Sequence, residues 1–277
     1  MLKIVLIVVI VLARRGGRRH ATSVPSSGAG RRRSCVLKPR CRAVAMQAPQ
    51  RVDFKELDHL PAPVQRYLRT VLKEGQPLVA GAGLRHTGSF NTGEEFAAWK
   101  PFSSEQQVTT RRPGFDWDGR IAMLPGLTVR VHDAYVAGEG RLHAAVLGLI
   151  SVADLRDRGG LAEGELMRFL AEAAWYPTAL LPSQGVHWEA IDARSARATL
   201  ADGAVRVALV FRFNEQGLID TVEAAARGRT VGKRIVPTPW QGRFWHYQER
   251  SQACWCRKTA RSRGCCRTAR APTGAAT

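Results

Sequence analysis

The middle of this 277-residue chain has no cysteine, and its two ends have no acidic residue. All 23 Asp and Glu residues lie within positions 51–250, where Lys and Arg residues nearly balance them. The formal net charge of +19 therefore belongs to the flanks. Residues 51–250 have the composition of an ordinary, near-neutral globular domain, which argues against nucleic-acid binding by the domain itself.

Motifs of several enzyme classes are also missing. The sequence has no HExxH, GxSxG or GxGxxG motif and no P-loop, and neither Ser183 nor Ser195 has a nucleophile-elbow context. The cysteines after residue 250 have CxC and CC spacings instead of paired CxxC, and no histidine lies among them. These absences argue against a nucleophilic hydrolase and against zinc. We therefore expect no catalytic residue, no metal site and no cofactor.

No apolar run is long enough to cross a bilayer as a helix, which takes about 20 residues. Residues 1–13, MLKIVLIVVIVLA, are almost wholly apolar, and the sequence RRGGRR follows them directly. This pattern is typical of a signal-peptide core or of a shortened membrane anchor. We therefore expect a membrane or cell-envelope location, with contact to the membrane through the N-terminus.

The flanking segments 14–50 and 251–277 have no hydrophobic periodicity. They are rich in Arg, Ala, Gly, Ser, Pro and Cys, all of which have GC-rich codons. Two interpretations stay open: out-of-frame translation, or natural disordered basic tails that bind nucleic acid or anionic lipid. The abrupt loss of alternation after Arg250 favours a frame error for the C-terminal segment.

The stretch from residue 161 to residue 213 has the strongest pattern. Apolar residues at i, i+4, i+7, i+8 and i+11 predict one face of a helix: Ala162, Leu166, Phe169, Leu170 and Ala173. Glu163 and Glu165 are expected in its first turn, where the helix dipole favours negative charge. Pro177 has no backbone N–H to donate, so this helix should end near Trp175, and a second short apolar run ends at Pro182.

Period-2 alternation dominates the other parts of the domain. Two alternating runs around Asp202-Gly203 predict a β-hairpin over residues 195–213. A further helical region is expected at 54–73. Other strands are expected at residues 84–90, 95–102, 105–111, 115–123, 129–135, 142–146, 218–225 and 241–248. The fold class is thus α+β: a single domain over 51–250 with one large, curved, antiparallel sheet. We expect this sheet to be a half-barrel-like meander covered by two or three helices.

Large apolar and amphipathic side chains gather beside the proline-bounded turns, where they could line a cleft for a lipid or another apolar ligand. The set consists of Trp175, Tyr176, Leu180, Leu181, Trp188, Trp240 and Trp245. Arg168 and Glu172, one helical turn apart, would hold a ligand head group. The alternative is that the rings pack in the core and that Arg168 and Glu172 form a plain i,i+4 surface pair.

A pair of carboxylates offers a different chemistry. Asp116 and Asp118 lie on one face of an expected strand, about 7 Å apart, and could bind a hard cation or act as an acid/base pair. The alternative is a solvated face balanced by Arg120 and Arg130. His132 and Asp133 are adjacent and face opposite sides of their strand, so they cannot form a dyad.

Several runs together resemble an uncharacterised bacterial family, a domain of unknown function with an N-terminal hydrophobic segment. The runs include LPAPVQRYLRTVL, PGFDWDGRI, EAAWYPTALLPS and PTPWQGRFWHY, and the similarity covers roughly residues 57–248. The resemblance implies no established activity. It implies a half-barrel of the lipoprotein-carrier type, an analogy of fold that carries function only weakly. Members would continue beyond residue 247 with further strands, where this chain turns Arg/Cys-rich.

The sequence therefore favours an envelope-associated protein that binds a lipid or another apolar ligand without catalysis. One alternative is a metal-dependent enzyme that uses the Asp116/Asp118 face. Another is binding of nucleic acid or an anionic membrane through the basic tails.

Overall fold

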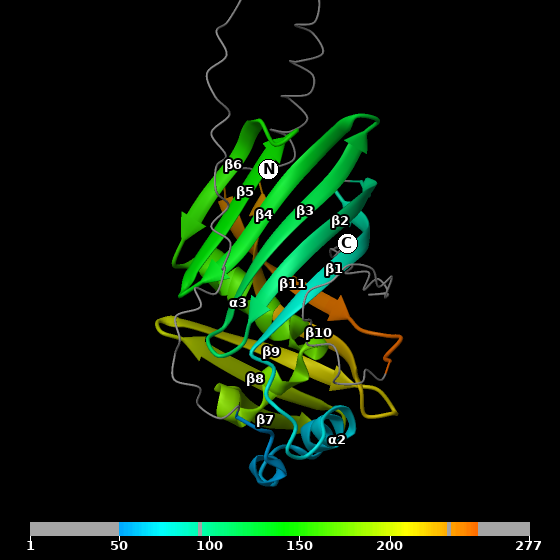
Figure 1. The fold of residues 1–277 in the computed structure, drawn as a ribbon, viewed down its shortest axis with the longest axis vertical. Coiled ribbons are helices and arrows are strands. Elements are labelled where there is room, and N and C mark those ends of the chain that lie inside the picture. Colours follow the sequence, from blue (N-terminus) through cyan, green and yellow to red (C-terminus); the bar gives the residue numbers. More distant parts are fainter. Residues whose placement is uncertain (1–49, 94–95, 232–233, 249–277) are drawn as a thin grey trace, which may run out of the picture.

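The computed structural model describes residues 50–93, 96–231 and 234–248 (Figure 1). The hydrophobic segment expected at 1–13, the tail at 251–277 and all but the last residue of the segment at 14–50 lie outside the described residues. Among the helices that are described, none is long and apolar enough to cross a membrane.

Two antiparallel sheets make up most of the fold. The first is a six-stranded meander of β1 (Gly81–Asn91), β2 (Trp99–Thr109), β3 (Gly114–Leu124), β4 (Leu127–Val136), β5 (Glu139–Val146) and β6 (Ile150–Asp157). The second is a five-stranded meander of β7 (His187–Asp192), β8 (Ser195–Asp202), β9 (Val205–Phe213), β10 (Ile219–Val231) and β11 (Arg234–Arg243). In both sheets each strand pairs with its neighbour in the sequence.

The helical elements are few. Near the N-terminus, η1 (Phe54–Leu57) precedes α2 (Ala62–Val71), and between the sheets α3 (Gly160–Glu172) is followed by η2 (Ala173–Trp175), η3 (Pro177–Leu180) and η4 (Pro182–Gln184). The helical region expected at 54–73 is thus divided, since Pro61 and Pro63 begin a new helix.

The α+β class and the antiparallel arrangement are confirmed, but the single large sheet is wrong. The described strands form two open sheets, because the chain leaves β6 through α3 and three short 3-10 turns before it enters β7. Pro177 and Pro182 begin two of these turns, since a fixed φ suits the start of a helix and interrupts a strand. Strand pairing is therefore broken between β6 and β7.

Individual strand predictions had mixed outcomes. The hairpin at 195–213 is confirmed as β8 and β9, and the helix ending near Trp175 is confirmed as α3 with η2. The two strands expected at 95–102 and 105–111 are one strand, β2, whose alternation continues through buried Ser104 and Gln106. The last strand, β11, ends at Arg243, so the strand expected at 241–248 is misplaced, and β6 and β7 were not predicted.

The helix α3 lies between the two sheets and contacts both of them (Figure 1). On one side it packs against β9 and β10, and on the other against β3, β4, β5 and β6. Leu166, Phe169 and Leu170 are fully buried in the core that results. Burial of each such side chain contributes about 1.5–3 kcal/mol to stability, so α3 holds the two sheets together.

Candidate functional site

The inner face of the six-stranded sheet is the face that packs against α3, and only part of it is covered. Phe115 and Tyr135 belong to the core shared with α3, whereas Val129 and Val146 form a separate apolar cluster nearer the other end of the strands. Beside that second cluster lies a groove of ≈ 180 Å³.

Apolar side chains from five strands line the groove. They include Phe90, Ile121, Val131, Leu142 and Val152, and the one charged residue among the lining residues is Asp133. The inner face therefore has an apolar groove with a single carboxylate in its wall.

Trp117 forms part of the groove wall because a glycine makes room for its ring. A Cβ atom on Gly119 would lie only 2.1 Å from Cη2 of Trp117, so the indole lies directly over this glycine. Gly119 is two residues further along β3 and therefore on the same face. The indole of Trp117 therefore lies between the groove and the buried core and contributes to both.

Asp133 connects the groove to a buried polar cluster. Its Oδ2 accepts a hydrogen bond from Nη1 of Arg168 at 3.2 Å, whereas its Oδ1 is buried and has no hydrogen-bond partner. Burial raises the pKa of Asp133, and the positive charges of Arg168 and Arg227 oppose that rise. An unpartnered buried acceptor favours any hydrogen-bond donor that can reach it.

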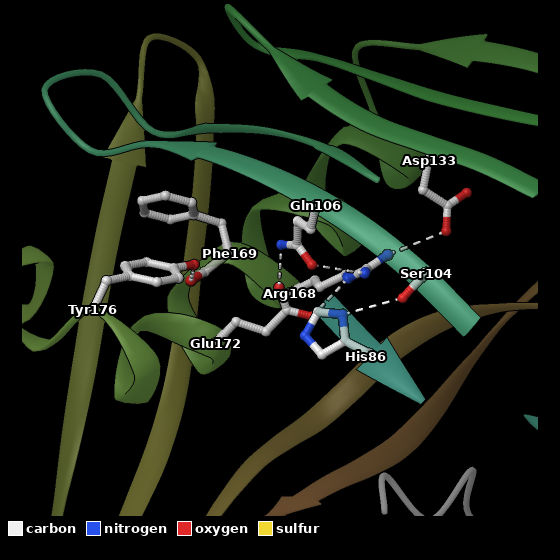
Figure 2. A network of polar contacts seen from close by, with 8 residues as sticks. All are labelled: His86, Ser104, Gln106, Asp133, Arg168, Phe169, Glu172 and Tyr176. Carbon is white, nitrogen blue, oxygen red and sulfur yellow. Dashed lines mark hydrogen bonds and ion pairs between the residues drawn. The ribbon is translucent and has the colours of Figure 1, made fainter. Parts of the chain in front are cut away.

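Arg168 is the centre of this cluster (Figure 2). Its Nε donates to Oε1 of Glu172 at 2.8 Å, and its guanidinium carbon lies 4.9 Å from the ring centre of Phe115 and 5.0 Å from that of Trp117. Burial lowers the pKa of Arg168, but Glu172 and Asp133 outweigh that effect and raise it above its ordinary value. Arg168 thus stays charged and is held by carboxylates and aromatic faces.

Strands β1 and β2 supply three further polar side chains of Figure 2: His86, Ser104 and Gln106. Gln106 donates from Nε2 to Oε2 of Glu172 at 2.6 Å, and Nδ1 of His86 lies 3.1 Å from Oγ of Ser104. Burial lowers the pKa of His86. The neutral imidazole therefore predominates near pH 7, and the cluster gains no positive charge from it.

Glu165 is the residue whose place differs most from expectation. It lies beyond the first turn of α3, is 6% exposed, and has an Oε2 atom without a hydrogen-bond partner. Burial and the neighbouring charge of Asp133 raise its pKa to about 8. The prediction that Glu165 stabilises the helix dipole is wrong, whereas Glu163 does lie in the first turn.

Arg227 is a second basic group near the cluster, and its positive charge opposes the rise in the pKa of both Asp133 and Glu165. Arg227 comes from β10 of the second sheet, and its guanidinium carbon lies 5.4 Å from the ring centre of Trp240. The cluster therefore brings charged groups of both sheets close to α3.

The side chains expected to line a ligand cleft have several different environments. Tyr176, Leu180 and Leu181 are fully buried, Trp188 is nearly so, Trp175 and Trp240 are partly buried, and Trp245 is 40% exposed. Tyr176 donates its hydroxyl hydrogen to the carbonyl of Phe169, and Trp188 donates to that of Leu180. None of these seven residues lines the groove described above.

Arg168 and Glu172 form the i,i+4 pair that the sequence suggested, but not at the surface. Their side chains are 16% and 15% exposed. Arg168 also donates a hydrogen bond to Asp133, so this pair lies next to the one charged residue that lines the groove.

The carboxylates of Asp116 and Asp118 lie on the outer face of the sheet, away from α3. Asp116 Oδ1 lies 2.9 Å from Nε2 of His132, and this hydrogen bond raises the pKa of His132. Asp133, next in the sequence, points to the inner face, so His132 and Asp133 do face opposite sides as predicted. Among the described residues no group of three or more His, Cys, Asp or Glu side chains could hold a metal ion.

The polar cluster was missed by sequence reasoning, although a signal was present. Glu165, Arg168 and Glu172 recur at i, i+3 and i+7, beside the apolar stripe of the same helix. Asp133 alternates in phase with Val129 and Val131, so its position on the apolar face could be read from the sequence. Polar residues at such positions need buried partners, so their coincidence on one helix and one strand indicates a buried network.

Comparison with known proteins places the chain in a family. No curated protein and no solved structure matches it. One family model, described as a family of unknown function (DUF6920), matches residues 58–263. The match begins close to the expected residue 57 and extends past the start of the Arg/Cys-rich tail. Because it covers most of the sequence, the chain belongs to DUF6920, a family of unknown function.

Proposed function

We propose that this protein binds an apolar ligand, such as a lipid chain, in the groove on the inner face of its six-stranded sheet. The proposal includes no chemical step on the ligand. One observation carries it: an apolar groove on an otherwise well-packed sheet, with one buried carboxylate in its wall.

The size of the groove limits the ligand. Sites for drug-sized molecules enclose about 300–1,000 Å³. At ≈ 180 Å³ the groove is smaller, and it suits one hydrocarbon chain or a small apolar molecule. The half-barrel curvature and the envelope location expected from the sequence fit such a role and belong to the proposal.

Asp133, the one charged residue of the groove wall, limits the charge of the ligand. Its negative charge disfavours a ligand that carries an ionised carboxylate, whereas Oδ1 itself is buried behind the groove surface. Arg168 and Glu172 hold Asp133 in place and do not need to touch the ligand. No observation on the outer face favours the alternative of an enzyme that uses Asp116 and Asp118.

Variants in which a larger side chain fills the groove test whether the ligand binds there. Ala144 lines the groove, so Ala144→Phe would occupy part of it, and Val152→Phe would do the same from the edge strand β6 with less strain in the core. Ala122→Phe makes the same kind of change on the exposed outer face of β3 and is the matched control.

The full chain would be titrated with N-phenyl-1-naphthylamine, a neutral apolar probe that fluoresces on burial. We expect the parent and the Ala122→Phe variant to bind alike, and at least one groove variant with an unchanged Tm to bind at least tenfold more weakly. Absence of probe binding by the parent, or equal binding by all four proteins, would overturn the proposal.

A further inference from the structure

Large apolar side chains gather at one end of the six-stranded sheet. Six of the ten that are exposed in the described residues lie there: Phe96, Trp99, Leu124, Leu147, Leu149 and Ile150. Phe96 and Leu149 are each 84% exposed. Isolated exposed apolar residues are ordinary, but a group of them marks an interaction surface.

The meander explains why they meet. In an antiparallel sheet alternate turns lie at the same end, so the turns β1–β2, β3–β4 and β5–β6 are neighbours, at the top of Figure 1. The backbone N–H of Leu147 donates to the carbonyl of Thr128 at 2.8 Å and ties two of these turns together. We call residues 91–93, 96–101, 120–130 and 145–152 the apolar tip.

The opposite end of the same sheet differs in character. Its turns have the sequences Thr110-Arg111-Arg112-Pro113 and Ala137-Gly138 and carry no large exposed apolar side chain. Arg112 is paired with Asp202 of the second sheet at 3.0 Å. The exposure of large apolar groups is therefore a property of one end and not of turns in general.

Backbone hydrogen bonds close two of the turns in the apolar tip. The N–H of Thr92 donates to the carbonyl of Ala98 at 2.9 Å, and that of Leu149 donates to the carbonyl of Val146 at 3.0 Å. Each such bond lowers the cost of moving the turn from water to the interface of a bilayer. Leu147 has a φ of 52° and Gly148 a φ of 69°, the left-handed pair of a tight hairpin turn, and Ala137 and Gly138 repeat this geometry at the opposite end of the sheet.

The charges of the apolar tip indicate the partner. The ionisable side chains among its described residues are Lys100, Arg120 and Arg130, all basic. In the sequence Glu94 and Glu95 stand between residues 93 and 96, so this end of the sheet has three basic and two acidic residues. Arg130 reaches the β5–β6 turn, where its Cδ would lie 3.2 Å from a Cβ on Gly148. Basic groups beside protruding apolar groups fit an anionic bilayer surface.

We infer that the apolar tip inserts into the surface of an anionic lipid bilayer. Trp99 would lie at the level of the head groups, where tryptophan is enriched, and the leucines of the β5–β6 turn would reach the acyl chains. This docking does not depend on the groove.

The groove extends to the same end of the sheet. Phe90, Met123 and Val129 line it and lie within one or two residues of the β1–β2 or β3–β4 turn. A chain that leaves the bilayer at the apolar tip can therefore enter the groove without crossing water. This route, unlike the docking, rests on the proposed function.

The test compares matched variants of the full chain on vesicles. Leu147→Asn with Leu149→Ser removes two exposed leucines, and asparagine tolerates the left-handed conformation. Leu155→Ser with Ile191→Ser removes two exposed apolar side chains outside the apolar tip and is the control. Vesicles of phosphatidylcholine, with and without phosphatidylglycerol, would be used for flotation and for hydrogen exchange.

On anionic vesicles we expect slower amide exchange at residues 96–99 and 147–150 of the parent, and at least threefold weaker partition of the tip variant than of the control. Unchanged exchange in these segments, with binding through other parts of the chain, would overturn the inference. Suppose instead that the parent self-associates, that the tip variant does not, and that vesicles give the apolar tip no protection from exchange. The apolar tip would then be a contact between two copies of the chain, and the inference would be overturned. Titration with N-phenyl-1-naphthylamine without vesicles reports the groove separately, so the two proposals can fail independently.

Discussion

Replacement of Glu165 by glutamine should change how the stability of the protein depends on pH. Glu165 is buried on α3, its Oε2 has no hydrogen-bond partner, and its pKa is raised from 4.5 to about 8. The folded protein therefore holds this proton more tightly than the unfolded chain does. Glutamine has nearly the same shape and cannot ionise.

The sign of the effect follows from linkage. Below pH 4.5 the carboxyl group is protonated in both states, and it contributes no pH dependence. As the pH rises from 4.5 to 8, the unfolded chain releases the proton while the folded protein retains it, so stability falls. Above pH 8 both states are ionised and the loss is complete.

The magnitude can be worked from the two pKa values. Each pKa unit corresponds to about 1.4 kcal/mol, so the rise from 4.5 to about 8 gives an upper bound of about 5 kcal/mol. Between pH 5 and pH 8 the corresponding bound is about 4 kcal/mol. Because Arg168 and Arg227 can adjust toward an ionised Glu165, we expect about 2–3 kcal/mol in practice.

Urea unfolding of the full chain at pH 5, 6.5 and 8, under reducing conditions, measures this quantity. We expect the free energy of unfolding of Glu165→Gln, relative to the parent, to increase by about 2–3 kcal/mol from pH 5 to pH 8. Glu163→Gln alters an exposed carboxylate on the same helix and serves as control. If Glu165→Gln followed the parent within about 1 kcal/mol over this range, the buried, protonated state of Glu165 would be refuted.

Three further changes test other parts of the structure. Asp133→Asn removes a buried carboxyl group whose pKa is raised by burial, so the variant should lose less stability than the parent as the pH rises above 3.8, measured by urea titration. A pH dependence parallel to that of the parent would contradict this burial. Leu166→Ala should cost about 2–5 kcal/mol in the same assay, because the side chain is fully buried between α3 and the sheets, and a smaller cost would argue against that packing. Asp116→Asn should lower the pKa of His132 in an NMR titration, since the hydrogen bond between them raises it. The parent should therefore lose the small stabilisation from this pair as the pH rises through the pKa of His132 in the folded state, and an unchanged titration would show that the bond is absent.

The parts of the fold that could be predicted are those where one face is uniformly apolar. Leu166, Phe169 and Leu170 recur at helical spacing, and Val205, Val207 and Leu209 alternate, so α3 and the β8–β9 hairpin follow directly from the pattern. β6 has an exposed or half-exposed side chain at every position, as an edge strand can, and therefore gave no alternation. The helix and the proline-bounded turns after β6 were predicted, but whether β7 pairs again with the first sheet is a tertiary property.

The candidate site could not be predicted, because its polar residues occupy positions on faces that are otherwise apolar. Ser104 and Gln106 occupy inner-face positions of β2, so the strand looked interrupted at the place where it carries the polar cluster. Arg168 and Glu172 were recognised as a pair, but their burial requires both sheets to meet α3, which is a tertiary property. Trp188 and Tyr176 looked like cleft residues because a buried amphipathic ring and an exposed one have the same sequence context.

The sequential order of the strands has a consequence for how the molecule is assembled. Both meanders pair only strands adjacent in the chain, so each can form through short loop closures before the other is complete. The helix α3 is continuous with the end of the first meander and contacts β9 and β10 of the second. Its docking brings the two meanders together, while the packing of α2 against β8 joins segments still farther apart in the sequence. The two meanders therefore acquire fixed positions relative to each other only after long-range contacts form, although each meander is local in itself.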